Sequence, residues 1–82
     1  MANPANTSLT VDGLMAAAFN RPRDARSEAY RAGTRAALMR FFERFTLPLP
    51  FEVGTAEADA FFAGETEGRQ IIARTWETEQ VA

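Results

Sequence analysis

The side chains that could do chemistry in this chain are arginines and carboxylates, because its 82 residues include no histidine and no cysteine. The usual general base at neutral pH, the commonest metal ligand and the thiol nucleophile are therefore all missing. Ser8 and Ser27 have no histidine to activate them. No phosphate-cradling loop or nucleotide fingerprint is present either. We predict a protein that is not an enzyme and that uses no cofactor and no small-molecule substrate.

The carboxylates suggest one alternative chemistry, which is cation binding. Four of them lie close together in the last third of the chain: Glu57, Asp59, Glu65 and Glu67. They lack the glycine-turn loop spacing of a calcium site. Carboxylates on a predicted helix are more often solubilising charges, so we predict no metal site.

The arginines are concentrated in the middle of the chain. Residues 21–45 contain seven arginines and three acidic residues, whereas residues 46–82 contain seven acidic residues and two arginines. Complementary faces of two packed helices would explain this segregation, and a basic stripe for a polyanion is the alternative. The absence of lysine does not distinguish between these two explanations, because a GC-rich genome also encodes arginine in place of lysine. The nucleic-acid candidates are Arg26, Tyr30, Arg31, Arg35, Arg40 and Arg44, with Arg21 and Arg23 just before them.

The hydrophobic pattern predicts an all-α domain of three helices, at about residues 9–19, 24–45 and 55–79. Pro22 ends the first helix, since it disfavours helical geometry at the residue before it. Asp24 and Thr55 are the expected N-caps of the second and third helices. Residues 1–8 lack periodicity and contain turn formers, so we expect a disordered N-terminus before a single helical domain of residues 9–82.

The two long helices are expected to form an antiparallel hairpin with an ordered connection. Pro48 and Pro50 prevent the second helix from continuing. Alternating apolar residues, Leu47, Leu49, Phe51 and Val53, then suggest that the connection covers the open end of the hairpin. A proline-rich ligand for a partner domain is the alternative to such a core lid.

Two glycines four residues apart, Gly64 and Gly68, lie inside the third predicted helix, where each costs about 1 kcal/mol relative to alanine. Residues 28–33 and 59–64 share the order acid, Ala, aromatic, any residue, Ala, Gly. Folding the chain at about residue 50 places Gly33 opposite Gly68 and Ala37 opposite Gly64. We predict that these four small residues let the helices approach closely. Alternatively, they are weak points of alanine-rich helices.

The same register places the aromatic residue Phe41 on the inner face, opposite Phe61. Other large apolar residues exceed what a thin core can cover, since sixteen residues of the chain are alanine. Uncovered apolar side chains usually mark a partner surface, so we expect a protein partner or a homodimer. The protein-interface candidates are Met39, Phe42, Phe45, Phe62 and Trp76.

Nothing near the start of the chain predicts targeting or membrane insertion. No basic residue precedes Arg21, and the longest apolar run there, residues 14–19, is too short for a signal or a membrane span. The cytoplasm is therefore the expected compartment.

The spacings Tyr30-x-x-Gly33, Pro50-Phe51 and Phe62-x-Gly64 resemble those of small proteins of the ribosome modulation factor type and their phage-borne relatives. The resemblance covers residues 28–68. It implies a pair of helices joined by a linker that docks on ribosomal RNA and holds ribosomes in a resting dimer. In this chain it points to Tyr30, Arg31 and Arg35.

These observations lead to two functional expectations. The first is a small helical interaction module that binds a protein partner or itself. The alternative is an RNA- or ribosome-associated factor that uses the arginine face of the second helix.

Overall fold

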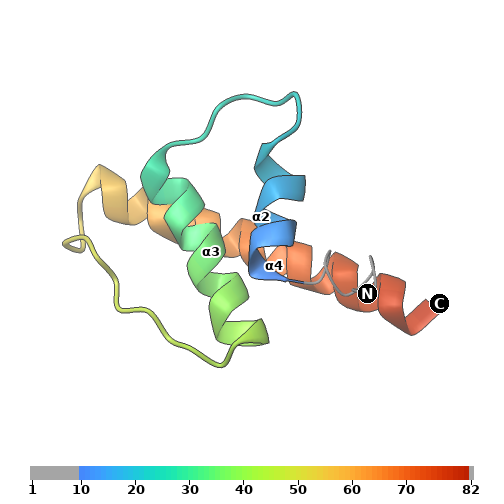
Figure 1. Ribbon diagram of the computed structural model, residues 1–82. Helices are drawn as coiled ribbons and strands as arrows, with labels where there is room; N and C mark the ends of the chain where they lie inside the picture. The colour runs from blue at the N-terminus through green and yellow to red at the C-terminus, as the bar shows by residue number, and fades with distance from the viewer. Residues whose placement is uncertain (1–9, 82) are drawn as a thin grey trace.

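The structure is a computed structural model that describes the backbone of residues 10–81 and the side chains of residues 10–76. Within that range it contains three helices and no strand: α2 (Val11–Phe19), α3 (Glu28–Phe42) and α4 (Ala56–Val81) (Figure 1). The predicted all-α class with three helices is confirmed. The predicted disorder of residues 1–8 lies outside the described residues.

Each helix begins at a hydroxyl side chain that accepts a hydrogen bond from the amide three residues further on. The acceptors are Thr10, Ser27 and Thr55, at donor–acceptor distances of 2.9, 3.1 and 3.1 Å. These bonds satisfy amides that have no partner inside the helix. The predicted cap at Thr55 is confirmed, whereas α3 is capped by Ser27 and starts at Glu28, so the predicted cap at Asp24 is wrong.

The C-terminal end of α3 is set by a left-handed residue. Arg44 has a φ of 57°, which no helix can continue. The Phe45 amide then donates to the Met39 carbonyl at 3.3 Å and closes the last turn. As a result, α3 ends at Phe42 and not at the predicted residue 45.

The connection of residues 43–55 covers the helices only in part. Phe51 packs edge-on against Phe61 of α4, with ring centroids 6.2 Å apart. In contrast, Val53 is 80% exposed and Leu47 is also exposed. The expectation that all four alternating apolar residues form a lid is therefore wrong for these two. Leu47 lies just before the first proline of the connection and Val53 in the turn just before α4, and both side chains are exposed there.

The backbones of α3 and α4 are in direct contact at glycine residues. A Cβ on Gly33 would collide with the Phe61 carbonyl, and a Cβ on Gly64 with the Tyr30 carbonyl. A Cβ on Gly68 would lie 2.7 Å from the Ala37 Cβ. Only glycine permits such an approach. The small residues that the sequence singles out therefore all lie where the two helices touch.

The register of this contact differs from the expected one. Gly33 faces Phe61 and Ala37 faces Gly68, so the predicted pairs Gly33 with Gly68 and Ala37 with Gly64 are wrong. Residues 27–29 and 56–60 share one surface hollow, and residues 37–44 and 69–76 share another. The helices therefore cross obliquely with their N-terminal ends on the same side, and they do not run antiparallel.

The connection makes this crossing feasible. Figure 1 shows it leading from the end of α3 back to the start of α4. Residues 43–55 span up to roughly 40 Å when extended, whereas α3 is only about 22 Å long. The chain is thus long enough to return along the whole helix before α4 begins.

The crossing also contains a buried polar residue, Thr34, which is fully inaccessible. Its hydroxyl donates to the Gly64 carbonyl at 2.9 Å, so the buried group is satisfied. The hydrophobic core lies beside the crossing, where α2 packs on the long helices. Its buried members are Val11, Ala18, Leu38 and Ile71.

We expect the substitution Gly64→Ala to lower the free energy of unfolding by about 2 kcal/mol or more, because the new Cβ would collide with the Tyr30 backbone. Without that contact, alanine would raise it by about 1 kcal/mol through helix propensity. Urea unfolding followed by far-UV circular dichroism measures the difference. The control is the exposed neighbour Ala63→Gly, which should lose only about 1 kcal/mol. A Gly64→Ala variant as stable as the parent chain would contradict the close contact.

Candidate functional site

A partly buried cluster around Glu67 contains one of the two ion pairs among the described side chains. Arg23, in the segment between α2 and α3, binds this carboxylate with two guanidinium nitrogens, Nη1 and Nη2, at 2.8 and 3.1 Å. The Tyr30 hydroxyl donates to the same carboxylate at 2.5 Å. Arg23 also donates to the Ala18 carbonyl at 3.0 Å. One carboxylate of α4 is thus linked to α2, to α3 and to the segment that joins them.

The electrostatics of this cluster keep each member in its ordinary charge state at neutral pH. The hydrogen bond from Arg23 is the main cause that lowers the pKa of Glu67 from 4.5 to about 2. Burial, assisted by the hydrogen bond to Glu67, raises the pKa of Tyr30. A general acid or base needs a pKa near the working pH, and these shifts lead away from it. We therefore assign the cluster a structural role.

The pH dependence of stability tests this assignment. A lowered pKa in the folded state contributes stability above the unfolded pKa of about 4.5 and loses it as the pH falls toward about 2. The variant Glu67→Gln should therefore show a weaker loss of unfolding free energy across this range. Urea unfolding at several pH values measures it, with Glu65→Gln, which removes a carboxylate outside the cluster, as the control. Equal slopes for Glu67→Gln and the parent chain would contradict the assignment.

A hollow between the C-terminal part of α3 and the middle of α4 forms the second notable arrangement, and we call it the arginine–aromatic hollow. Its aromatic side chains, Phe41 and Trp76, are 44% and 57% exposed. Its only charged side chains are arginines. The complete lining is Ala37, Arg40, Phe41, Arg44, Arg69, Ile72 and Trp76. The hollow therefore combines accessible aromatic surface with three positive charges.

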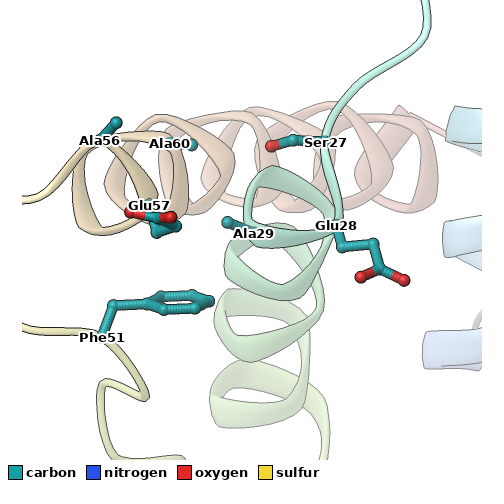
Figure 2. A pocket seen from close by; sticks show the side chains of 7 residues that line it. All are labelled: Ser27, Glu28, Ala29, Phe51, Ala56, Glu57 and Ala60. Atoms are coloured by element: carbon teal, nitrogen blue, oxygen red, sulfur yellow. The ribbon is translucent and has the colours of Figure 1, made fainter.

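A second hollow lies on the other side of the crossing, and we call it the alanine-floored hollow. Its charged residues, Glu28 and Glu57, are both acidic. Figure 2 shows Phe51 pointing across it from the connection toward α3, with Glu57 between the Phe51 ring and α4. Its lining consists of Ser27, Glu28, Ala29, Phe51, Ala56, Glu57 and Ala60. The two hollows thus have opposite charge.

The structure separates the five protein-interface candidates. Trp76 lies in the arginine–aromatic hollow, while Phe45 and Phe62 are exposed elsewhere, at 54% and 43%. Met39 and Phe42 pack against the core beside α2. The five therefore do not share one environment, since one lines a hollow, two are exposed elsewhere and two pack against the core.

The structure also divides the nucleic-acid candidates in and next to α3. Arg40 and Arg44 line the arginine–aromatic hollow. The Arg26 guanidinium lies over the Tyr30 ring, 4.9 Å from its centroid, and so faces away from that hollow. These arginines therefore do not form a continuous stripe.

The remaining candidates of α3 lie apart from the hollow. Arg31 is exposed on the helix surface. Arg35 is paired with Asp12 of α2 at 2.8 Å. Both residues are candidates from the resemblance as well as from the charge pattern, and neither lines the arginine–aromatic hollow or the alanine-floored hollow.

Besides the apolar Ile72, sequence reasoning missed two residues of the arginine–aromatic hollow. Phe41 was expected on the inner face opposite Phe61, which is wrong because it is exposed and packs edge-on against Phe42. Arg69 belongs to the acidic last third of the chain, and only the crossing places it beside Arg40 and Arg44. No local pattern indicates either position, since both follow from the direction of the crossing.

Comparison of the chain with protein-family models, with curated proteins and with solved structures found no match. The resemblance to the ribosome modulation factor type therefore stays a prediction. Among the described residues, no group of three or more carboxylates is placed to hold a metal ion. No helix in residues 10–81 combines the length and apolarity needed to cross a membrane.

Proposed function

We propose that this chain is a small non-enzymatic interaction module that binds an acidic, apolar protein segment through the arginine–aromatic hollow. The observation that carries the proposal is the pairing of two exposed aromatic residues, Phe41 and Trp76, with a lining whose charges are all arginine. Aromatic residues and arginine are the residue types most enriched in the centres of protein interfaces.

The chemistry of the hollow favours carboxylates on the partner. Arg40, Arg44 and Arg69 can each bind a carboxylate with two parallel hydrogen bonds. Ala37 and Ile72 supply an apolar base between them. A partner helix with apolar residues along one stripe and acidic residues on its flanks would satisfy both requirements.

The hollow is formed before any partner arrives. Its two walls belong to α3 and α4, which are held by the contact between Ala37 and Gly68 and by the buried Thr34 hydrogen bond. Binding to a rigid, pre-formed surface orders few additional groups, so less of the interaction energy is lost.

Trp76 is the single tryptophan of the chain, so its fluorescence reports directly on the hollow. We expect a helical probe peptide of leucine and glutamate, with leucines at i, i+3, i+4 and i+7, to shift the Trp76 emission to the blue. A peptide with lysine at every glutamate position is the matched control and should bind at least about tenfold more weakly. The variant Arg40→Glu/Arg44→Glu should reverse this preference. Equal responses to both peptides, or none, would refute the proposal.

A single-stranded nucleic acid is the second candidate ligand, because Phe41 and Trp76 could stack bases while the arginines contact phosphates. The net charge of −2 for the whole chain opposes it. Fluorescence anisotropy with a labelled uridine decamer decides the matter. Binding that weakens steeply with salt and disappears in Trp76→Ala would favour RNA, whereas no binding at about 50 mM salt excludes it.

A further inference from the structure

We infer that the segment that fits the arginine–aromatic hollow is a second copy of this chain, which presents its alanine-floored hollow. The inference deepens the proposed function and rests on it. In this head-to-tail self-association, the arginine–aromatic hollow of one molecule contacts the alanine-floored hollow of the next.

Charge complementarity is the first argument. The lining of one hollow carries three arginines and no acid, and the lining of the other carries Glu28 and Glu57 and no base. Figure 2 shows Glu57 beside Phe51 and the Glu28 carboxylate at the margin, turned away from both, so Glu57 is the main acid of this surface. Both glutamates are exposed, and Arg40 and Arg44 are exposed too. Docking the two hollows on each other therefore joins opposite charges that the fold leaves accessible, which favours this pairing over contact between like surfaces.

Shape is the second argument. Trp76 projects from α4 with more than half of its surface exposed. On the opposite side of the crossing, the floor is made of Ala29, Ala56 and Ala60, which are among the smallest side chains available, and Phe51 stands beside them as a wall (Figure 2). A large aromatic ring can therefore enter between small residues and meet a second ring, an arrangement typical of interface anchors.

The geometry of the crossing determines the kind of assembly. The N-terminal ends of α3 and α4 lie on one side and the residues of the arginine–aromatic hollow on the other. Along α4, Glu57 and Trp76 are about 28 Å apart. A contact between two different surfaces so far apart is heterologous, so it leaves one free hollow at each end of a dimer. We therefore expect the average mass to keep rising with concentration and not to stop at two copies.

The first experiment measures mass against concentration by static light scattering. We expect the average mass of the parent chain to rise at about 50 mM salt and to return toward that of a monomer at about 0.5 M salt, where charges are screened. Ala56→Leu fills the floor and should abolish the rise, whereas the matched control Ala63→Leu, on the same helix outside the hollow, should retain it. A mass independent of concentration, or a plateau at two copies, would overturn the inference.

The second experiment mixes two variants that are each blocked on one side. Arg40→Glu/Arg44→Glu blocks the arginine–aromatic hollow, and Ala56→Leu blocks the other. Each alone should remain monomeric, and an equimolar mixture should form a dimer and nothing larger, since each variant supplies the surface that the other lacks. Far-UV circular dichroism confirms that both are folded. A mixture that stays monomeric, or a blocked variant that associates like the parent chain, contradicts head-to-tail docking.

The two proposals fail separately. A chain that stays monomeric up to about 1 mM yet binds the leucine–glutamate peptide through Trp76 would refute self-association and leave the proposed function standing. A chain that neither associates nor binds that peptide would refute both. Binding of the uridine decamer alone would replace the protein partner by a nucleic acid.

Discussion

The structure depends on one constraint, the contact of two helix backbones at glycine. Gly33 and Gly64 each face a carbonyl of the opposite helix with no room for a Cβ. Thr34 lies between them and places its hydroxyl on the Gly64 carbonyl. In a chain with so many alanines and few large apolar residues, such close approach lets small side chains bury area that would otherwise need larger ones. The close contact between the two helices thus supplies packing that large apolar side chains provide in other small domains.

The direction of the crossing determines where every exposed feature of the molecule lies. Because α3 and α4 have their N-terminal ends on the same side, their first turns, which carry acidic residues, meet at one hollow. Their later turns line the arginine–aromatic hollow, which places Arg69 beside Arg40. In an antiparallel pair, the acidic first turn of each helix would lie beside the arginines in the later turns of the other. The opposite charges of the two hollows are therefore a consequence of helix direction.

The clustered arginines of the sequence have several separate roles in the fold. Arg23 forms an ion pair with Glu67, and Arg35 forms one with Asp12. The Arg26 guanidinium lies over the Tyr30 ring. The ion pair of Arg23 spans 44 residues of sequence and joins the segment after α2 to α4. Of the remaining arginines, Arg31 is exposed alone on the α3 surface, whereas Arg40, Arg44 and Arg69 lie together beside Phe41 and Trp76. These three arginines thus form one compact candidate site.

The sequence by itself determined the local features: three helices, the hydroxyl cap at Thr55, the break after α3 and the contact role of the glycines. The cap and the break depend on residues within one or two helical turns, and the four-residue spacing of the glycines marks one small-residue face of α4, so composition and spacing suffice for these features. Only the tertiary structure decided the register, the exposure of Phe41 and the placement of Arg69. These depend on the direction in which two helices cross, which is set by contacts between residues about thirty positions apart and by a connection long enough to permit either direction.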